Sequence, residues 1–506
     1  MLFNSFQFLI FFPIVILIYF ICPDKILRMG GGLGIHLKNL WLLAASYYFY
    51  MSWNAKYGLL LLFCTIVTYI AARSVDALRN SDTGPGQKRR MVFVVSLILI
   101  FSILVYYKYF NFLLNNLVQL FSAAGIQLSV PSFDIVLPVG ISFFTFQAAG
   151  YLIDVYRGDT RAEQNFLQYA LFVSFFPQLV AGPIERSNNL LKQLAQPSKF
   201  DYERARDGFY LMLWGYFMKM VIADRAAVLV DNIYNSYTER TGAAIVLATI
   251  VFAFQVYGDF GGYSTIAMGA AKVLGVDLID NFKSPYLSTS IGELWGRWHI
   301  SLNAWFKDYL YIPLGGGRKG KVRKYINLII VFLVSGLWHG ARWSYVMWGG
   351  LNGLYSIAEA LAEPLRKRFR ARFGIDVNSF SHRLWRWLTT FALFDFSTIF
   401  FRAAGAGEAL YMIRKIVTDF SPSSVLAGAQ YSYGLDENNF KLLILSVILL
   451  LIADYCKCRG ICIREKLKRQ ETWFRVLTVS ASILFIIVFG VWGNAYNAKS
   501  FIYFQF

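Results

Sequence analysis

Long apolar segments, separated by short polar or basic ones, dominate the chain. They run at about 3–20, 39–53, 56–72, 91–122, 134–156, 166–181, 208–230, 243–274, 290–312, 325–338, 343–361, 385–402, 441–455 and 474–492. Their apolar residues are continuous rather than alternating, which is typical of membrane helices and excludes a membrane β-barrel. Several are shorter than the ~20 residues that an upright crossing needs. The pattern predicts an all-α polytopic membrane protein with about eleven to thirteen crossings plus re-entrant or interfacial helices.

One apolar run is interrupted in a way that predicts a broken helix. Residues 175–183 read FFPQLVAGP, with two prolines and a glycine. Proline removes a backbone donor from a helix, and non-helical backbone at membrane depth must be covered by protein or water. We therefore expect a re-entrant or broken helix here.

The charge distribution follows the apolar pattern. Hydrophobic residues make up 57% of the chain and charged residues 16%, with a net charge of +19. Lysine and arginine gather between apolar segments, at 73–90, 318–324, 366–372 and 457–469. This is the positive-inside bias of a membrane protein, so we expect no nucleic-acid partner. Placing these clusters and the segment 23–38 in the cytoplasm puts the N-terminus outside.

The first apolar segment is expected to be an uncleaved span. The residues before it lack the basic region of a signal peptide, and no small-residue cleavage site follows. The same topology makes 325–361 an outward and returning pair, with His339 at its bend. His339 follows Tyr325 by about fourteen helical residues, or ~21 Å, so it should lie in the outer half of the ~30 Å hydrocarbon core.

His339 is the first candidate for chemistry. It lies in residues 335–341, SGLWHGA, between apolar segments. A neutral imidazole can take a proton from a hydroxyl, and ionisable groups within membranes are functional candidates by default. A purely structural role, in which His339 is hydrogen-bonded inside the helix bundle, is an equally good interpretation.

His299 is the second candidate, within residues 295–302, WGRWHISL. Glu293, Arg297 and Ser301 are spaced four apart, so on one helix they would share a face from which His299 points away. A structural ion pair between Glu293 and Arg297 is favoured over a catalytic one, because such pairs are routine on helices.

Three further groups of residues are weaker candidates. Residues 315–322, GGGRKGKV, nearly form a phosphate-binding loop, but Val322 replaces the required Ser or Thr and the strand context is missing. We reject a nucleotide hydrolase and expect a basic loop that can meet phosphate groups of a donor. Cys456, Cys458 and Cys462 have no histidine nearby, so no metal site is expected. Structural pairing is favoured over tunnel lining for three intramembrane polar residues: Asp224, Gln255 and Asp259.

The two histidine segments carry a family resemblance. Residues 295–302, followed by 305–316 (WFKDYLYIPLGG), and residues 335–341 resemble the two signatures of the membrane-bound O-acyltransferase family. Residues 137–147 (LPVGISFFTFQ) and 176–186 (FPQLVAGPIER) resemble blocks of its bacterial branch, which includes alginate and peptidoglycan O-acetylation proteins and teichoic acid D-alanyl transfer proteins. The resemblance extends to 501–506.

The resemblance implies one membrane domain over 1–506, with a catalytic core at about 134–361, extra spans at about 385–492 and a central tunnel. It makes His339 the catalytic histidine and His299 the second active-site position. The residues expected to line the tunnel or the donor path are Trp298, Asn303, Lys319, Lys321, Ser335 and Trp338. No tightly bound cofactor or metal is expected; the donor would be acetyl-coenzyme A or an acylated carrier protein.

The implied activity is transfer of an acyl group, with acetyl favoured, across the bacterial inner membrane to an extracytoplasmic polysaccharide. Membrane lipid, an extracytoplasmic SGNH-hydrolase-like partner and an acyl carrier protein are the implied partners. Two alternatives remain open: D-alanyl transfer to teichoic acid, and a transporter or export channel without chemistry.

Overall fold

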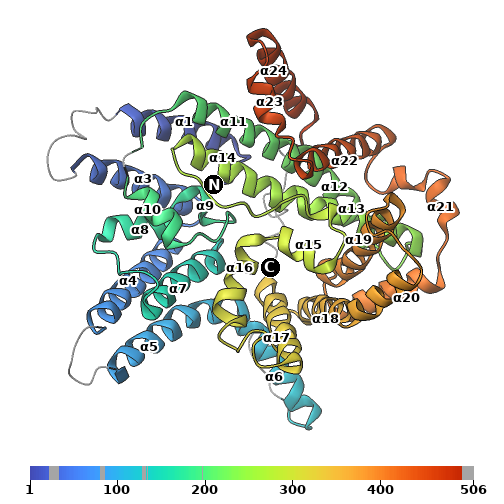
Figure 1. Cartoon of the computed structure of the whole chain (residues 1–506), viewed down its shortest axis with the longest axis horizontal. Helices are drawn as coiled ribbons and strands as arrows, with labels where there is room; N and C mark the ends of the chain where they lie inside the picture. The colour runs from blue at the N-terminus through green and yellow to red at the C-terminus, as the bar shows by residue number, and fades with distance from the viewer. Residues whose placement is uncertain (22–32, 80–85, 128–132, 134, 197, 493–506) are drawn as a thin grey trace. The chain divides into compact units, whose positions relative to one another are not determined.

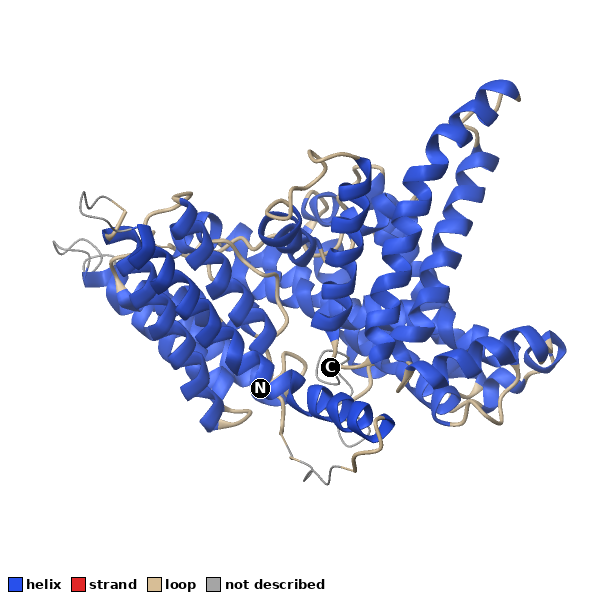
Figure 2. Cartoon of the chain, turned by 90° about the horizontal axis from the view of Figure 1, so that it is seen from below, coloured by secondary structure: helices blue, strands red, loops and turns tan. Residues whose placement is uncertain are grey.

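The computed structural model describes residues 1–21, 33–79, 86–127, 133, 135–196 and 198–492, and all regular structure in these ranges is helical (Figure 2). This confirms the all-α class. Predictions about most of the segment 23–38 and about residues 501–506 lie outside the described residues.

The chain folds into two compact units. Unit 1 comprises Met1–Met212 with Ile266–Ile279, and unit 2 comprises Leu213–Thr265 with Asp280–Phe506. The prediction of a single membrane domain with its core at 134–361 stays a prediction.

Unit 1 is built from helices that Figure 1 draws from blue to green. They are α1 (Phe6–Ile21), α3 (Leu33–Met51), α4 (Ala55–Ala77), α5 (Gly86–Leu104), the π-helix η1 (Val105–Tyr109), α6 (Phe110–Ala123), α7 (Ile141–Arg157), α8 (Phe166–Ser174), α9 (Phe176–Leu179), the π-helix η2 (Ser187–Leu191) and α10 (Lys192–Leu194). Two helices belong to both units, α11 (Tyr202–Tyr216) and α14 (Gly262–Val273).

Unit 2 contains both histidine segments. Its helices are the π-helix η3 (Phe217–Ala223), α12 (Asp224–Asn235), α13 (Gly242–Val256), the π-helix η4 (Tyr257–Gly261), the 3₁₀ turn η5 (Pro285–Leu287), α15 (Ile291–Arg297), α16 (Ile300–Phe306), the π-helix η6 (Lys307–Tyr311), α17 (Lys321–His339), α18 (Trp343–Arg372), α19 (Phe380–Arg402), α20 (Ala406–Thr418), α21 (Pro422–Leu426), the 3₁₀ turn η7 (Ala429–Ser432), α22 (Glu437–Cys458), α23 (Ile463–Lys468) and α24 (Thr472–Phe489).

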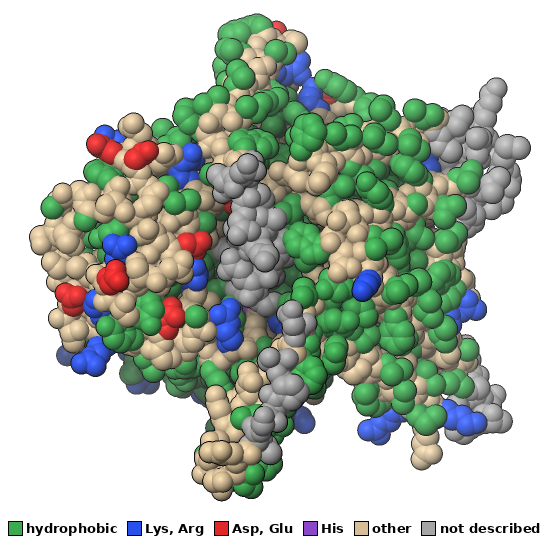
Figure 3. All heavy atoms as spheres, turned by 180° about the vertical axis from the view of Figure 1, so that it is seen from behind, with side chains coloured by type: hydrophobic (Ala, Val, Ile, Leu, Met, Phe, Trp, Pro, Cys, Tyr) green, Lys and Arg blue, Asp and Glu red, His purple; other side chains and the backbone are tan. Residues whose placement is uncertain are grey.

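Six helical stretches among the described residues are long and apolar enough to cross a membrane. They are Ala55–Ala77, Gly86–Ala123, Gly242–Val273, Lys321–His339, Glu437–Cys458 and Thr472–Phe489. Hydrophobic side chains occupy large areas of the face shown in Figure 3, next to a part that carries more polar and charged side chains. Helices α22 and α24 occupy the apolar segments predicted at 441–455 and 474–492, whereas the total of eleven to thirteen crossings stays a prediction.

The interrupted run at 175–183 is a broken helix, as predicted. Helix α8 ends at Ser174, α9 lasts four residues, and residues 183–186 are not helical. Residues 171–185 are all buried, so protein covers this irregular backbone.

Helices α17 and α18 form the predicted helical pair, and His339 is the last residue before the bend, whereas the outward direction of α17 stays a prediction. Two glycines allow the helices to cross closely. A Cβ on Gly336 would lie 2.2 Å from the carbonyl oxygen of Tyr345, and one on Gly349 would lie 2.2 Å from that of Phe332. Small residues at such crossings are a common packing device in membranes, and here they bring the end of α17 against α18.

Candidate active site

The backbone of its own helix holds the His339 ring. Its Nδ1 lies 2.7 Å from the carbonyl oxygen of Ser335, one turn earlier on α17. A carbonyl oxygen can only accept, so Nδ1 carries the proton and donates it, which leaves Nε2 as the basic nitrogen. His339 is buried, and so is the side chain of Ser335. In the neutral ring this bond fixes the tautomer with Nε2 as the acceptor, which is what a general base requires.

Aromatic side chains surround that ring. The centroids of Trp338 and Trp348 both lie 5.0 Å from the centroid of His339, and that of Phe401 lies 5.5 Å away. These residues come from α17, α18 and α19 respectively. A ring enclosed in this way is shielded from bulk water, which strengthens electrostatic interactions around it.

His299 occupies a break between two short helices. It stands between α15 and α16 with φ 43°, a left-handed conformation that few non-glycine residues adopt. The prediction that Glu293, Arg297 and Ser301 share one helical face is therefore wrong for Ser301. The ion pair between Glu293 and Arg297 is confirmed, with 2.6 Å between Oε1 and Nη2. Strained backbone of this kind clusters at functional sites.

Asn281 fixes this break from outside the helices. Its backbone carbonyl oxygen accepts from the N–H of Ile300 at 3.0 Å, and its Oδ1 accepts from the hydroxyl of Ser301 at 2.6 Å. Its Nδ2 donates to the hydroxyl of Ser264 at 3.1 Å. Asn281 is 1% exposed, and nothing in the sequence pattern pointed to it.

Asn303 and Trp298, both predicted to line the tunnel or donor path, hold the His299 segment by hydrogen bonds and by ring packing respectively. Nδ2 of Asn303 donates to the carbonyl oxygens of Trp295 and Trp298, each at 2.6 Å, and so caps the end of α15. The ring of Trp298 packs among Phe282 and Phe394, with centroids 5.0 and 5.3 Å away. These contacts make Asn303 a residue that positions the His299 segment.

Trp338 joins the two histidines. Its ring centroid lies 5.9 Å from that of His299 and 5.0 Å from that of His339. Phe260 also packs against His299, with 4.7 Å between the two ring centroids. Burial lowers the pKa of His299 well below its ordinary value, and the neighbouring His339 lowers it further. The structure thus brings together His299, Ser335, Trp338 and His339 in one buried cluster of unit 2.

Lys319 and Lys321 lie elsewhere. Lys319 stands in the turn before α17, and Lys321 is the first residue of that helix. Eighteen helical residues separate Lys321 from His339, which corresponds to about 27 Å. These lysines are therefore at the opposite end of α17 from the catalytic candidate.

Two tryptophans that the sequence did not single out add hydrogen-bond donors to the site. The buried Nε1 atoms of Trp295 and Trp348 have no acceptor among the described residues. Their ring centroids lie 5.6 Å apart, and the ring of Trp348 also contacts that of His339. A buried N–H without an acceptor is costly, which makes these donors available to a bound carbonyl oxygen.

A buried ionic cluster lies beside the site. Nζ of Lys219, in η3, is 2.6 Å from Oδ1 of Asp224 and 2.5 Å from Oδ1 of Asp259, in η4. Gly258 lets the two π-helices approach, since a Cβ there would lie 2.8 Å from the carbonyl oxygen of Met218. The structural pairing predicted for Asp224 and Asp259 is confirmed.

Comparison with known proteins identifies the family. The model of the membrane-bound O-acyltransferase family matches residues 160–391, a range that contains both histidines. The chain is 33% identical over 531 residues to the probable alginate O-acetylase AlgI of Pseudomonas putida, covering 100% of both proteins. It is 31% identical over 549 residues to the peptidoglycan O-acetyltransferase of Helicobacter pylori, covering 100% of this chain and 98% of that protein.

A third relative is more distant. The teichoic acid D-alanyltransferase of Streptococcus thermophilus is 30% identical over 240 residues, which cover 43% of this chain and 55% of that protein. All three relatives transfer an acyl group according to their names, and the apolar helices make this chain a multi-pass membrane protein. The chain belongs to the membrane-bound O-acyltransferase family and is an O-acyltransferase.

Proposed function

We propose that this protein transfers an acetyl group from a thioester on the cytoplasmic side of a bacterial inner membrane to a hydroxyl acceptor outside it. The transfer would serve O-acetylation of an alginate-like exopolysaccharide or of peptidoglycan. The observation that carries the proposal is the hydrogen bond from Nδ1 of His339 to Ser335, which leaves a basic Nε2 in a buried aromatic site. The full-length match to two O-acetylating relatives supports acetyl as the transferred group.

The reaction follows from the state of the His339 ring. Nε2 accepts the proton of the acceptor hydroxyl while the hydroxyl oxygen attacks the thioester carbonyl carbon. The carbon–sulfur bond then breaks, and the departing thiolate takes the proton from Nε2, so the ring returns to its neutral form. The Ser335 carbonyl stabilises the transient imidazolium, because it accepts from the Nδ1–H throughout.

The remaining donors act on the carbonyl oxygen of the thioester. This oxygen becomes negatively charged when the hydroxyl attacks, and donors fixed in a dry site stabilise it strongly. The indole N–H of Trp348, on a ring in contact with His339, is the donor we assign to this role. His299, joined to His339 through Trp338, would hold the acceptor or the thioester.

The donor and the partner complete the proposal. Lys319 and Lys321, at the basic end of α17, suit the phosphate groups of coenzyme A or of a phosphopantetheine carrier protein. The positive-inside distribution favours a cytoplasmic position for that end and an extracytoplasmic N-terminus. An SGNH-hydrolase-like protein with a nucleophilic serine would receive the acetyl group outside the membrane.

Incubation of the purified protein with acetyl-coenzyme A, and separately with acetylated carrier protein, tests the proposal. We expect the free thiol of one donor to appear when a hydroxyl acceptor is present and to be absent with His339→Ala. Mass spectrometry of the acceptor distinguishes a transferred acetyl group from D-alanine. D-alanine is the less favoured alternative, because the match to the teichoic acid D-alanyltransferase covers only 43% of this chain. Solute flux through reconstituted protein without any thioester would instead indicate a channel.

A further inference from the structure

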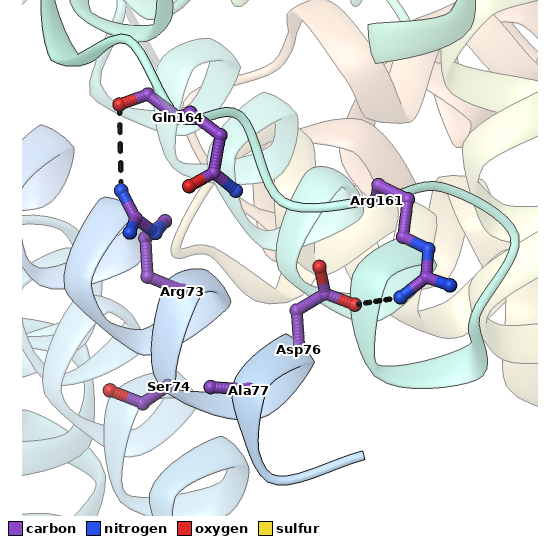
Figure 4. Close-up of a pocket in the computed structure, with 6 residues that line it drawn as sticks. All are labelled: Arg73, Ser74, Asp76, Ala77, Arg161 and Gln164. Atoms are coloured by element: carbon purple, nitrogen blue, oxygen red, sulfur yellow. Dashed lines mark hydrogen bonds and ion pairs between the residues drawn. The ribbon is translucent and has the colours of Figure 1, made fainter. Parts of the chain in front are cut away.

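A polar pocket of about 470 Å³ lies in unit 1, away from the histidines in the sequence (Figure 4). Its lining comes from the last turns of α4 and from the segment between α7 and α8: Arg73, Ser74, Asp76, Ala77, Arg161 and Gln164. Figure 4 shows Arg73 and Arg161 on opposite sides of Asp76. The reaction proposed above uses none of these residues.

The single carboxylate of the pocket holds its wall in place. Oδ1 of Asp76 lies 3.4 Å from Nη1 of Arg161, and Oδ2 accepts from the backbone N–H of Ala162 at 3.2 Å. The side chain of Asp76 is 13% exposed and that of Arg161 is 69% exposed. Asp76 thus anchors the α7–α8 segment, while most of the Arg161 guanidinium stays accessible.

The guanidinium of Arg73, like that of Arg161, keeps hydrogen-bond donors available to a ligand. Its Nη1 donates to the hydroxyl of Tyr69 at 3.2 Å and to the carbonyl oxygen of Gln164 at 3.5 Å. A guanidinium has five N–H donors in a planar fork, so each arginine can still present a pair of donors to a ligand. With two arginines and one carboxylate, the lining carries one net positive charge. This lining suits an anion with several oxygens, such as a phosphate ester.

The position of the pocket on α4 indicates where that phosphate comes from. Phe63, Ile66 and Ile70 are 43%, 38% and 57% exposed on this candidate membrane span. Their spacing continues to Arg73 and Ala77, so one helical face passes from exposed apolar side chains to the pocket. On a helix that crosses the membrane, such a face contacts lipid tails and ends at headgroup depth.

We infer that this pocket binds the phosphate of an anionic phospholipid headgroup, with the acyl chains lying along the Phe63–Ile66–Ile70 face of α4. Free phosphate offers the same oxygens but nothing that would lie on the apolar face. Basic pockets beside membrane helices recognise anionic lipid headgroups by these contacts. The bound lipid tethers α4 to the α7–α8 segment through the two arginines.

Native mass spectrometry of the full-length protein in detergent, titrated with phosphatidylglycerol, tests this site. We expect Arg73→Ala/Arg161→Ala to weaken binding of the first lipid about tenfold or more, since charge-assisted hydrogen bonds are lost. Lys56→Ala is the matched control, because Lys56 is an exposed cation at the other end of α4 and should leave binding unchanged. Equal lipid binding by wild type and the double alanine variant would overturn the inference.

Two further experiments complete the test. Competition by inorganic phosphate distinguishes a lipid headgroup from free phosphate, and a double lysine variant tests recognition without removing the charges. Inorganic phosphate at the same concentration should not displace the lipid; displacement would show a soluble-phosphate site and overturn the lipid assignment. Arg73→Lys/Arg161→Lys keeps both charges but loses the fork geometry, so its affinity should fall between those of wild type and the alanine variant. Wild-type affinity in this lysine variant would contradict recognition by the arginine forks.

Discussion

Nδ1 of His339 donates a hydrogen bond to the backbone carbonyl oxygen of Ser335, with 2.7 Å between the atoms. The bond joins a ring at the very end of α17 to the preceding turn of the same helix. It fixes both the tautomer and the direction of the ring without needing a carboxylate partner. Any change that moves the end of α17 should therefore move the base.

Replacing Trp348 with phenylalanine tests the role of its N–H. Phenylalanine keeps an aromatic ring near His339, but it removes the indole N–H and with it a donor to the developing oxyanion. We expect kcat to fall ~10²-fold with KM little changed, as for other oxyanion donors, and a lower melting temperature from the smaller buried ring. Trp385→Phe, at an exposed position on α19, is the control. A Trp348→Phe enzyme with wild-type kcat would remove this donor from the mechanism.

Gly336→Ala should damage the crossing of α17 and α18. The added Cβ would lie 2.2 Å from the carbonyl oxygen of Tyr345, so the helices must separate. Such overpacking costs about 1–3 kcal/mol and shifts His339, three residues away. Gly350→Ala adds a Cβ in ordinary contact, 3.4 Å from Cδ2 of Leu333, and should be tolerated. Thermal melting in detergent and thioester turnover measure both effects; equal behaviour of the two variants would count against the crossing.

Lys219→Met should destabilise unit 2. Two aspartates, Asp224 and Asp259, would lose the cation that both contact in the protein interior. Removing one partner of a buried ionic group costs about 3–5 kcal/mol, and we expect lower yield and a lower melting temperature. Lys272→Met removes the ion pair between Lys272 and Asp207. The side chain of Lys272 is 28% exposed, so this substitution should lower the stability less. If both variants melt alike, burial of the cluster is not what stabilises it.

Much of the architecture could be predicted from hydrophobic continuity and local breakers. The bend at His339, the broken helix near Pro177 and Pro183, and the ion pair of Glu293 with Arg297 depend on local spacing, and all three are observed. The prediction from local spacing is wrong for Ser301. The four-residue spacing of Glu293, Arg297 and Ser301 assumed one continuous helix, but the left-handed conformation of His299 interrupts it.

The parts of the site that could not be predicted depend on tertiary contacts. Phe401 reaches His339 from α19, and Asn281 reaches Ser301 from outside the helical segments. No periodicity links such positions. Trp348 looked like one more apolar residue of the returning helix, and only its buried N–H, without an acceptor among the described residues, distinguishes it. Lys319 and Lys321, expected along the tunnel or donor path, lie at the opposite end of α17 from His339, and their role stays a prediction.

The most direct test of the central claim is the initial rate of acetyl transfer from thioester to acceptor by purified His339→Ala protein. Loss of a positioned base should lower this rate ~10²–10⁴-fold while the melting temperature stays near that of wild type. His382→Ala, which changes a histidine near the start of α19, should keep the wild-type rate. Wild-type transfer by folded His339→Ala protein would contradict the assignment of His339 as the catalytic base.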